Sequence, residues 1–365
     1  MARKKPSGHA RAAVALGITT LLTVATVEFS PAGDLGDEAF GLRLGLALDR
    51  ASTFTDVVGL SASTAYPYLS SVNPAAGDFL REPPNQFRIV GTLTGAYVAF
   101  NNGSSLLAGA ASATYRLPTA GTILASYTRI DSQDVESHQG DHFTLRSNEL
   151  RLSYSHLLDK WISVGGSVRL TESRLGMSTL FSDFPVHTDT ESLGVEGSAG
   201  VLVAPHRHWL IGLFAALGWS RGETTGFADL PPPPFGPGFM PIDFSDNTRS
   251  LNIRGGLGWR PSEKFSAYAD WQYLRLTNDR NGSSDDSADV GRMYAGVEYL
   301  PIQILALRLG GSADTDRQFT VSGGVGFYPS KYFQAELAYV YNAFPEIRKE
   351  FGRAHLTSLS LARVF

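Results

Sequence analysis

The sequence predicts an all-β fold, a transmembrane antiparallel up-and-down β-barrel of about 14 strands. Apolar and polar residues alternate from residue 86 onward over segments of ten residues or more. Short and long connections between these segments alternate as well, and the last segment ends on Phe365. A soluble β-sandwich also alternates, but its strands are usually about five or six residues long. The segment length therefore favours a membrane wall.

The first 32 residues are predicted to be a signal peptide, since a basic head precedes residues 12–27, which carry no charge. The head consists of Arg3, Lys4, Lys5 and Arg11. The uncharged run is shorter than the roughly 20 residues that a membrane helix needs, so export is favoured over an uncleaved anchor. The cleavage site stays open between Ala25 and residues 30–32.

The alternating segments give fourteen predicted strands, each with its apolar side chains on one face. They span residues 86–100, 105–116, 121–131, 143–156, 161–173, 191–204, 209–221, 248–260, 264–277, 290–300, 304–313, 318–328, 331–342 and 354–365. An even number places both ends of the barrel on one side of the membrane, which we expect to be the periplasm.

The connections support this orientation. Those that follow even-numbered strands are short and belong on the periplasmic side: 117–120, 157–160, 205–208, 261–263, 301–303 and 329–330. Longer, polar or proline-rich connections are expected outside the cell, at 132–142, 174–190, 222–247, 278–289 and 343–353. Two outer connections, 101–104 and 314–317, are short and depart from the alternation.

Residues 59–76, GLSASTAYPYLSSVNPAA, precede the first strand and do not alternate. They resemble the N-terminal segment of the fatty-acid-transporter superfamily of outer-membrane proteins, in which a small-residue run leads into Asn-Pro-Ala. The motif here is Asn73-Pro74-Ala75, with Ala76 where the family usually has glycine. The resemblance implies a hatch, residues 33–85, folded into the lumen of a fourteen-strand barrel formed by residues 86–365. A lumen of that width needs a plug, a ligand or water.

Isolated charged residues on the polar face of the strands are predicted to point into the lumen. They could hold the hatch, pair with one another or line a wet pore, and none is assigned a catalytic role. They are Arg151, Arg169, Arg254, Arg292, Glu298, Arg308 and Glu336.

The connections 174–190 and 222–247 are unusually apolar for exposed loops, and exposed apolar surface commonly marks an interaction site. Their candidate ligand-capture residues are Met177, Leu180, Phe181, Phe184, Phe227, Leu230, Phe235, Phe239, Met240 and Phe244. In the resembled family, these two loops form a groove that first captures lipid-like substrates. The alternative is that the loops pack on each other and cap the barrel.

Several function classes are excluded or disfavoured. The chain has no cysteine, and its net charge of −4 gives no electrostatic case for nucleic acid. There is no Gly-x-Ser-x-Gly, phosphate-loop or His-Glu-x-x-His motif, so neither an enzyme nor a cofactor is expected. His206 and His208 flank a predicted tight turn, where a surface role is favoured over a metal site.

Three functions remain, with the bacterial outer membrane as the expected location. The first is passive uptake of hydrophobic small molecules such as long-chain fatty acids, as the resemblance implies. The second is a protein-binding shuttle like the related type nine secretion components, and the third is a pore for small polar solutes. Membrane lipids and a hydrophobic ligand are the expected partners. The terminal Phe365 resembles the signal that barrel-assembly machinery recognises.

Overall fold

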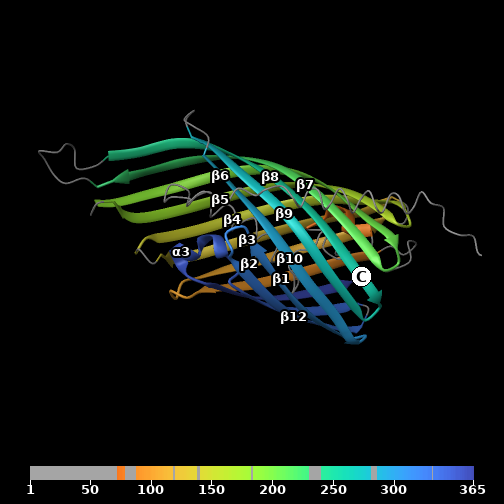
Figure 1. Ribbon diagram of the computed structural model, residues 1–365. Coiled ribbons are helices and arrows are strands. Elements are labelled where there is room, and N and C mark those ends of the chain that lie inside the picture. Colours follow the sequence, from red (N-terminus) through yellow and green to blue (C-terminus); the bar gives the residue numbers. More distant parts are fainter. Residues whose placement is uncertain are drawn as a thin grey trace, which may run out of the picture.

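The computed structural model describes residues 72–78, 88–117, 120–137, 140–181, 184–229, 240–280, 286–330 and 332–365. Fourteen strands in these residues close into one antiparallel barrel, as the sequence predicts (Figure 1). The predicted signal peptide and most of the predicted hatch lie outside the described residues. The hatch motif itself is described and forms part of the short 3-10 helix η2, Pro74–Asp78.

The strands follow one another around the wall in chain order. They are β1 Arg88–Phe100, β2 Ser105–Leu117, β3 Gly121–Glu136, β4 His142–Asp159, β5 Ile162–Phe181, β6 Phe184–His206, β7 Trp209–Ala228, β8 Met240–Ser262, β9 Phe265–Arg280, β10 Asp286–Ile302, β11 Leu305–Asp314, β12 Phe319–Ser330, β13 Phe333–Tyr341 and β14 Ala354–Val364.

The barrel closes where its first and last strands pair. The register runs from Val90 opposite Val364 to Phe100 opposite Ala354. Every described strand is therefore hydrogen-bonded on both sides, which is how a sheet crosses lipid without exposing unpaired backbone groups.

The outer face carries an apolar band bordered by aromatic side chains. On β7, Trp209 and Trp219 lie ten residues apart, both face outward, and the outward residues between them are apolar. Ten residues span about 34 Å along a strand. With a tilt of about 35–45°, this becomes roughly 24–28 Å across the membrane, close to the height of about 25 Å expected for a lipid-facing band.

The wall has very different heights on its two sides. Strands β5–β8 are 20 to 23 residues long, whereas β11–β13 have only 9 to 12. A strand of about 9–11 residues is enough to cross a bilayer. On β7 the nine residues after Trp219 therefore extend about 30 Å along the strand, which at the same tilt is roughly 22–25 Å above the membrane band. The outer mouth is oblique, high along β5–β8 and low along β11–β13 (Figure 1).

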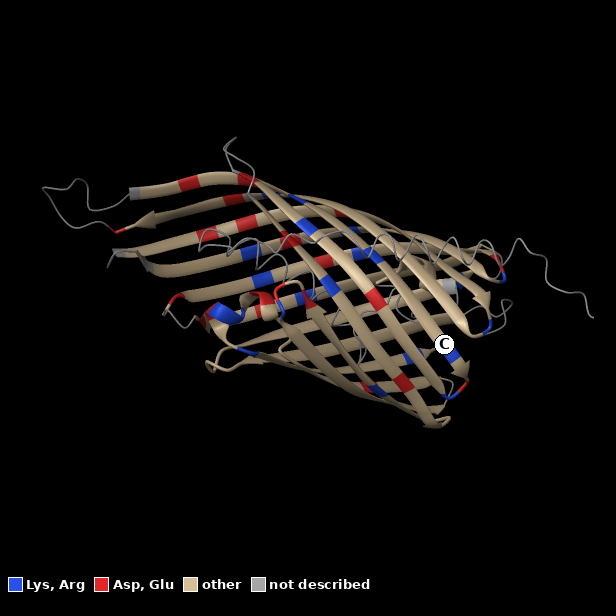
Figure 2. Cartoon of the chain, viewed as in Figure 1, with Lys and Arg blue, Asp and Glu red and all other residues tan. Residues whose placement is uncertain are grey.

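Because these strands are so long, parts of the predicted outer loops are strand in the structure. Within the predicted loop 174–190, residues 174–181 and 184–190 are the paired ends of β5 and β6, in register from Arg174 opposite Glu191 to Phe181 opposite Phe184. Much of 222–247 likewise forms the ends of β7 and β8, and smaller parts of 132–142 and 278–289 are also strand. The sequence hides these extensions because both strand faces above the membrane meet water, so the apolar alternation stops. Figure 2 shows the charged residues along these ends.

The outer connection after β13 turns inward. Asn342 begins this turn with a φ of 55°, a left-handed conformation that asparagine tolerates better than most residues. Its side chain donates a hydrogen bond to the Phe319 carbonyl at 2.7 Å. The chain then forms η3, Pro345–Ile347, and α3, Arg348–Phe351, before it rejoins the wall at β14. We call residues 342–353 the inner segment.

Candidate functional site

The lumen is the candidate site, and its lining changes along the barrel axis. Near the periplasmic end it holds the Asn-Pro-Ala motif. Charged and amide side chains surround the middle, and apolar side chains line the outer end.

The hatch motif is packed against the inner wall. Val72 to Gly77 are buried, and η2 lies on β3–β6. The Asn73 amide donates hydrogen bonds to the carbonyls of Val201, at 3.2 Å, and Leu213, at 3.5 Å. Its side-chain oxygen accepts one from the Ala75 backbone N–H at 3.1 Å. Asparagine thus joins the motif to two strands while it fixes the turn that starts η2.

Two glycines of the wall make room for this contact. Gly165 of β5 and Gly200 of β6 are opposite one another in the register. A Cβ at Gly165 would lie 2.5 Å from the Pro74 carbonyl carbon, and one at Gly200 would overlap the Asn73 side-chain oxygen. Only glycine therefore lets the motif backbone approach this closely. We call this Gly165–Gly200 pair the hatch socket.

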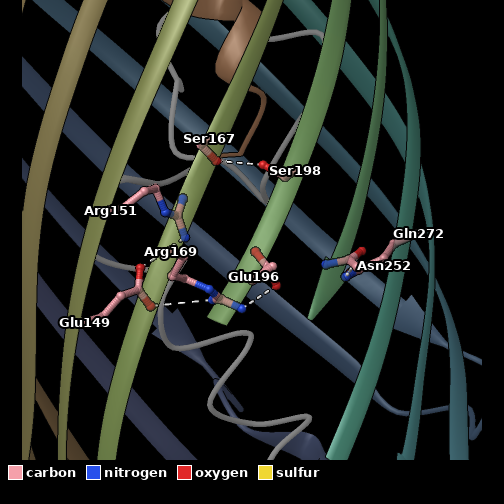
Figure 3. Close-up of polar contacts among 8 residues, drawn as sticks. All are labelled: Glu149, Arg151, Ser167, Arg169, Glu196, Ser198, Asn252 and Gln272. Carbon is pink, nitrogen blue, oxygen red and sulfur yellow. Dashed lines mark hydrogen bonds and ion pairs between the residues drawn. The ribbon is translucent and has the colours of Figure 1, made fainter. Parts of the chain in front are cut away.

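A first ionic network lies on β4–β6, farther along these strands toward the outer end than the hatch socket, and Figure 3 shows its four side chains. Arg169 bridges two carboxylates, Glu196 at 2.5 Å and Glu149 at 3.5 Å, and Arg151 contacts Glu149 at 3.1 Å. All four side chains are at most 16% exposed. Four charges of balanced sign therefore neutralise one another on this wall.

A second network lies on the opposite wall, on β10–β13. Arg308 contacts Glu298 at 2.9 Å, Glu336 at 3.1 Å and the Tyr328 hydroxyl at 2.6 Å. The Tyr328 hydroxyl in turn donates to Glu336 at 2.6 Å. Arg308 and Glu298 are almost fully buried. The guanidinium of arginine has five N–H donors, so it can bind several acceptors that converge on it.

Amide groups on β8–β10 extend the polar lining between these networks. Gln272 contacts Asn252 at 3.0 Å and the Tyr294 hydroxyl at 2.6 Å. Arg254 lies beside them, with its guanidinium carbon 6.0 Å from the centre of the Tyr294 ring. Figure 3 shows Asn252 and Gln272 across the lumen from the Arg169 network. Among the described residues, no group of acidic, histidine or cysteine side chains could hold a metal ion, and no helix could cross a membrane.

The outer end of the lumen has a different lining, which we call the outer apolar cluster. Inward-facing side chains of β1, β3, β4, β13 and β14 form it, and residues of β2 and β5 pack beside it. Its wall residues are Val98, Phe100, Ile130, Val135, Phe143, Leu145, Val340, Ala354 and Leu356, with Leu106, Ala108, Leu175 and Met177 at its margin.

The inner segment fills the outer apolar cluster with its own side chains. Phe344, Ile347 and Phe351 are each 3 to 4% exposed. The Phe351 ring centre lies 5.5 Å from that of Phe100 and 5.4 Å from that of Phe143, in tilted and edge-to-face arrangements. These separations are typical of favourable aromatic pairs.

An ion pair fixes the inner segment on the opposite side of the lumen. Glu346 of η3 contacts Arg292 of β10 at 2.5 Å, and both side chains are at most 5% exposed. Partial burial, together with the nearby Glu346 carboxylate, raises the pKa of Asp316 in the outer turn between β11 and β12. The inner segment therefore reaches from the wall at β1 and β4 to the wall at β10–β12.

Comparison with known proteins gives a match at the level of structure. No family model and no curated protein matches the sequence. The toluene transporter TbuX of Ralstonia pickettii superposes on 86% of this chain and 96% of its own, with 14% identity and a TM-score of 0.59. The monoaromatic hydrocarbon channel CymD covers 85% and 98%, with 14% identity and a TM-score of 0.58. A FadL homologue from Pseudomonas aeruginosa covers 86% and 97%, with 11% identity and a TM-score of 0.57.

The chain has the barrel fold of these FadL-like transporters. The resemblance predicted from residues 59–76 is therefore confirmed for the fold, including the number of strands. At 11 to 14% identity the comparison concerns architecture alone. Function must be argued from the lumen of this FadL-like barrel itself.

The predicted lumen charges of this FadL-like barrel all lie on inward faces. Six of them are in the two networks or the pair with Glu346, and Arg254 is the seventh: Arg151, Arg169, Arg254, Arg292, Glu298, Arg308 and Glu336. Their partners Glu149, Glu196 and Glu346 were not singled out from the sequence. Glu149 and Glu196 lie on the inward faces of β4 and β6, as the predicted lumen charges do. The two-residue period of a strand was therefore enough to identify them from the sequence.

The predicted capture residues that the structure describes lie on strands β5–β8. Met177 is on the inner face of β5 beside the outer apolar cluster, whereas Phe227 is on the outer face of β7, with its ring centre 5.1 Å from that of His187. Phe244 is half-buried on β8. Leu180, Phe181, Phe184 and Met240 belong to the ends of β5, β6 and β8, and Leu230, Phe235 and Phe239 lie outside the described residues.

Sequence reasoning missed the outer apolar cluster, although two signals for it exist. Residues 97–100, Tyr-Val-Ala-Phe, are apolar on both strand faces, which departs from the alternation of the other segments. Phe344, Ile347 and Phe351 have the i, i+3, i+7 spacing of a helix face. Connection 343–353 was predicted only as a polar outer loop, and the structure corrects this.

Proposed function

We propose that this chain is an outer-membrane channel for the passive uptake of hydrophobic compounds. The observation that carries the proposal is the outer apolar cluster, in which a continuous apolar lining faces the lumen of a membrane barrel. A pore for polar solutes has no need for such a lining, because its interior is normally polar. The toluene and monoaromatic hydrocarbon transporters that share the fold support the same substrate class.

The charged residues of the middle lumen fit this function as structural elements. The network on β4–β6 sets two arginines against two glutamates, and the network on β10–β13 holds two glutamates against Arg308, so the charges lie in direct contact with opposite ones. Charges paired in this way give little net field to attract ions or polar solutes into the lumen. We assign them to holding the barrel shape around the hatch segment.

Location and assembly are part of the proposal. The apolar outer face suits a membrane, and the predicted signal peptide, residues 1–32, would deliver the chain to the outer one. Phe365 is exposed on the outer face and its backbone N–H donates to the Ile89 carbonyl at 2.8 Å. We propose that Phe365 is recognised by the barrel-assembly machinery and then completes the pairing of the last strand with the first, where the barrel closes.

The test is uptake by whole cells, since lipopolysaccharide, unlike a phospholipid bilayer, resists hydrophobic solutes. Gram-negative cells that express the protein are compared with cells that express Phe143→Ser, which makes the outer apolar cluster polar. Phe327→Ser, on the lipid-facing side of β12, is the matched control. We expect faster entry of radiolabelled toluene with the wild type and the control, and several-fold slower entry with Phe143→Ser.

Radiolabelled sucrose is measured in the same cells. Entry of sucrose without any gain for toluene would instead support the polar-solute pore. No gain for either solute, together with a polypeptide that co-purifies in equal amount with the barrel, would support the protein-shuttle alternative.

A further inference from the structure

The inner segment places three of its own apolar side chains where the proposed function needs a ligand. We propose that the outer apolar cluster is a binding site for one compact, single-ring apolar molecule, and that Phe351 occupies this site until the ligand displaces it. The inference rests on the proposed function and adds a site, a ligand class and a closing element to it.

The size of the ligand follows from the group that now fills the site. Phe351 puts one aromatic ring between Phe100 of β1 and Phe143 of β4, with ring centres 5.5 Å and 5.4 Å away. Phe344 is stacked on Phe100 as well, with the two ring centres 6.4 Å apart. A benzene-sized molecule would find the same two aromatic neighbours in the same geometry.

The inner segment is a suitable closing element because its conformation depends on contacts with the barrel wall. Its longest helix, α3, has four residues. So short a helix has no stability of its own in water and depends on its contacts with the wall. Those contacts include the three apolar side chains, the hydrogen bonds of Asn342 with β12, backbone hydrogen bonds where the segment joins β13 and β14, and the pair between Arg292 and Glu346.

The Arg292–Glu346 pair acts as a latch at the middle of the segment. Removal of one carboxylate weakens the closed state without altering any residue that lines the aromatic site. The apparent affinity of a ligand rises with the fraction of molecules in the open state. A variant of the latch should therefore bind a ring-sized ligand more tightly than the wild type, although it gains no contact with that ligand.

The experiment is a fluorine NMR titration of detergent-purified protein with fluorobenzene. We expect wild-type binding to be weak and saturable. Phe351→Ala should bind about tenfold more tightly, because the competing ring is gone, and Glu346→Gln several-fold more tightly. Phe327→Ala, which removes an outward-facing ring from β12, should bind like the wild type. Heat-dependent migration on a gel checks that each variant is folded.

The outcomes separate this inference from the proposed function. Whole-cell uptake of toluene with no gain in fluorobenzene affinity for either Phe351→Ala or Glu346→Gln would overturn the inference and leave the function standing. A gain for Phe351→Ala alone would keep the site and overturn the latch. If neither uptake nor any saturable binding is found, the proposed function fails as well.

Discussion

The two ends of the described lumen are built on different principles. At the periplasmic end and in the middle, polar contacts join the hatch motif and the wall, through Asn73 and through the networks around Arg169 and Arg308. At the outer end, apolar side chains meet across the lumen, and the buried Arg292–Glu346 pair joins the inner segment to β10. The difference separates a region with fixed geometry from one whose contents can be exchanged.

Polar networks are directional, so a partner that leaves exposes a buried charge at high cost. Apolar contacts are not directional, and one ring can replace another without the loss of a hydrogen bond. In this barrel, the inner segment can therefore yield to a ligand at the outer end while the lower lumen keeps its shape. Three substitutions test this contrast. The expected loss of stability is largest in the polar network of the middle lumen, intermediate at the hatch socket and smallest on the exposed wall above the membrane.

The largest effect is expected for Arg308→Ala. This change removes the shared partner of Glu298, Glu336 and Tyr328 inside the barrel. Removal of one member of a buried ionic network typically costs about 3–5 kcal/mol. Urea unfolding in detergent, followed by tryptophan fluorescence, should show a loss of unfolding free energy of that order. A loss below about 1 kcal/mol would mean that the network is solvated like a surface pair.

An intermediate effect is expected for Gly200→Val in the hatch socket. The new side chain overlaps Asn73, and overpacking of this kind costs about 1–3 kcal/mol. Because the chain has no native cysteine, Ala76→Cys provides a reporter at a fully buried position. A maleimide should label this cysteine slowly in the otherwise native protein and much faster once Gly200→Val is added.

Gly197→Val is the matched control for the hatch socket. Gly197 is also on β6, but a Cβ there has no neighbour within 4 Å. Labelling of Ala76→Cys should be unchanged by this control. Equal labelling in the Gly197→Val and Gly200→Val proteins would contradict a socket shaped by glycine.

The smallest effect is expected on the tall wall above the membrane. Arg174 and Glu191 are paired across β5 and β6 at 3.2 Å, with both side chains more than half exposed. Exposed pairs of this kind contribute about 0–1 kcal/mol. Arg174→Ala should thus leave the urea midpoint almost unchanged. A shift comparable to that of Arg308→Ala would remove the distinction between the two regions.

The sequence predicts the membrane-spanning part of the fold well, because one face of each strand meets lipid. On β10, alternation from Arg292 to Tyr299 follows directly from this boundary, and the order and number of strands follow from the repeat. Above the membrane the constraint ends. Arg174 and Asp189 are as much part of strands as Leu170 is, yet no solvent difference between the two strand faces reveals it.

The candidate site is less predictable for a related reason. Strand parity identifies inward residues such as Arg169 and Phe143, but it does not say which of them meet across the lumen. The spacing of Phe344, Ile347 and Phe351 indicates one turn or two of amphipathic helix, yet nothing in the sequence fixes its docking surface. That surface is formed by β1, β3, β4, β13 and β14, which come together only when the barrel closes.

The most direct test of the account locates an apolar ligand within the lumen. Ala108 and Thr114 both face inward on β2, six residues or about 20 Å apart, and only Ala108 lies beside the outer apolar cluster. A nitroxide is attached to Ala108→Cys or Thr114→Cys, and the fluorine relaxation of bound fluorobenzene is measured. The account predicts strong relaxation from position 108 and weak relaxation from 114. Equal relaxation, or stronger relaxation from 114, would contradict an outer binding site.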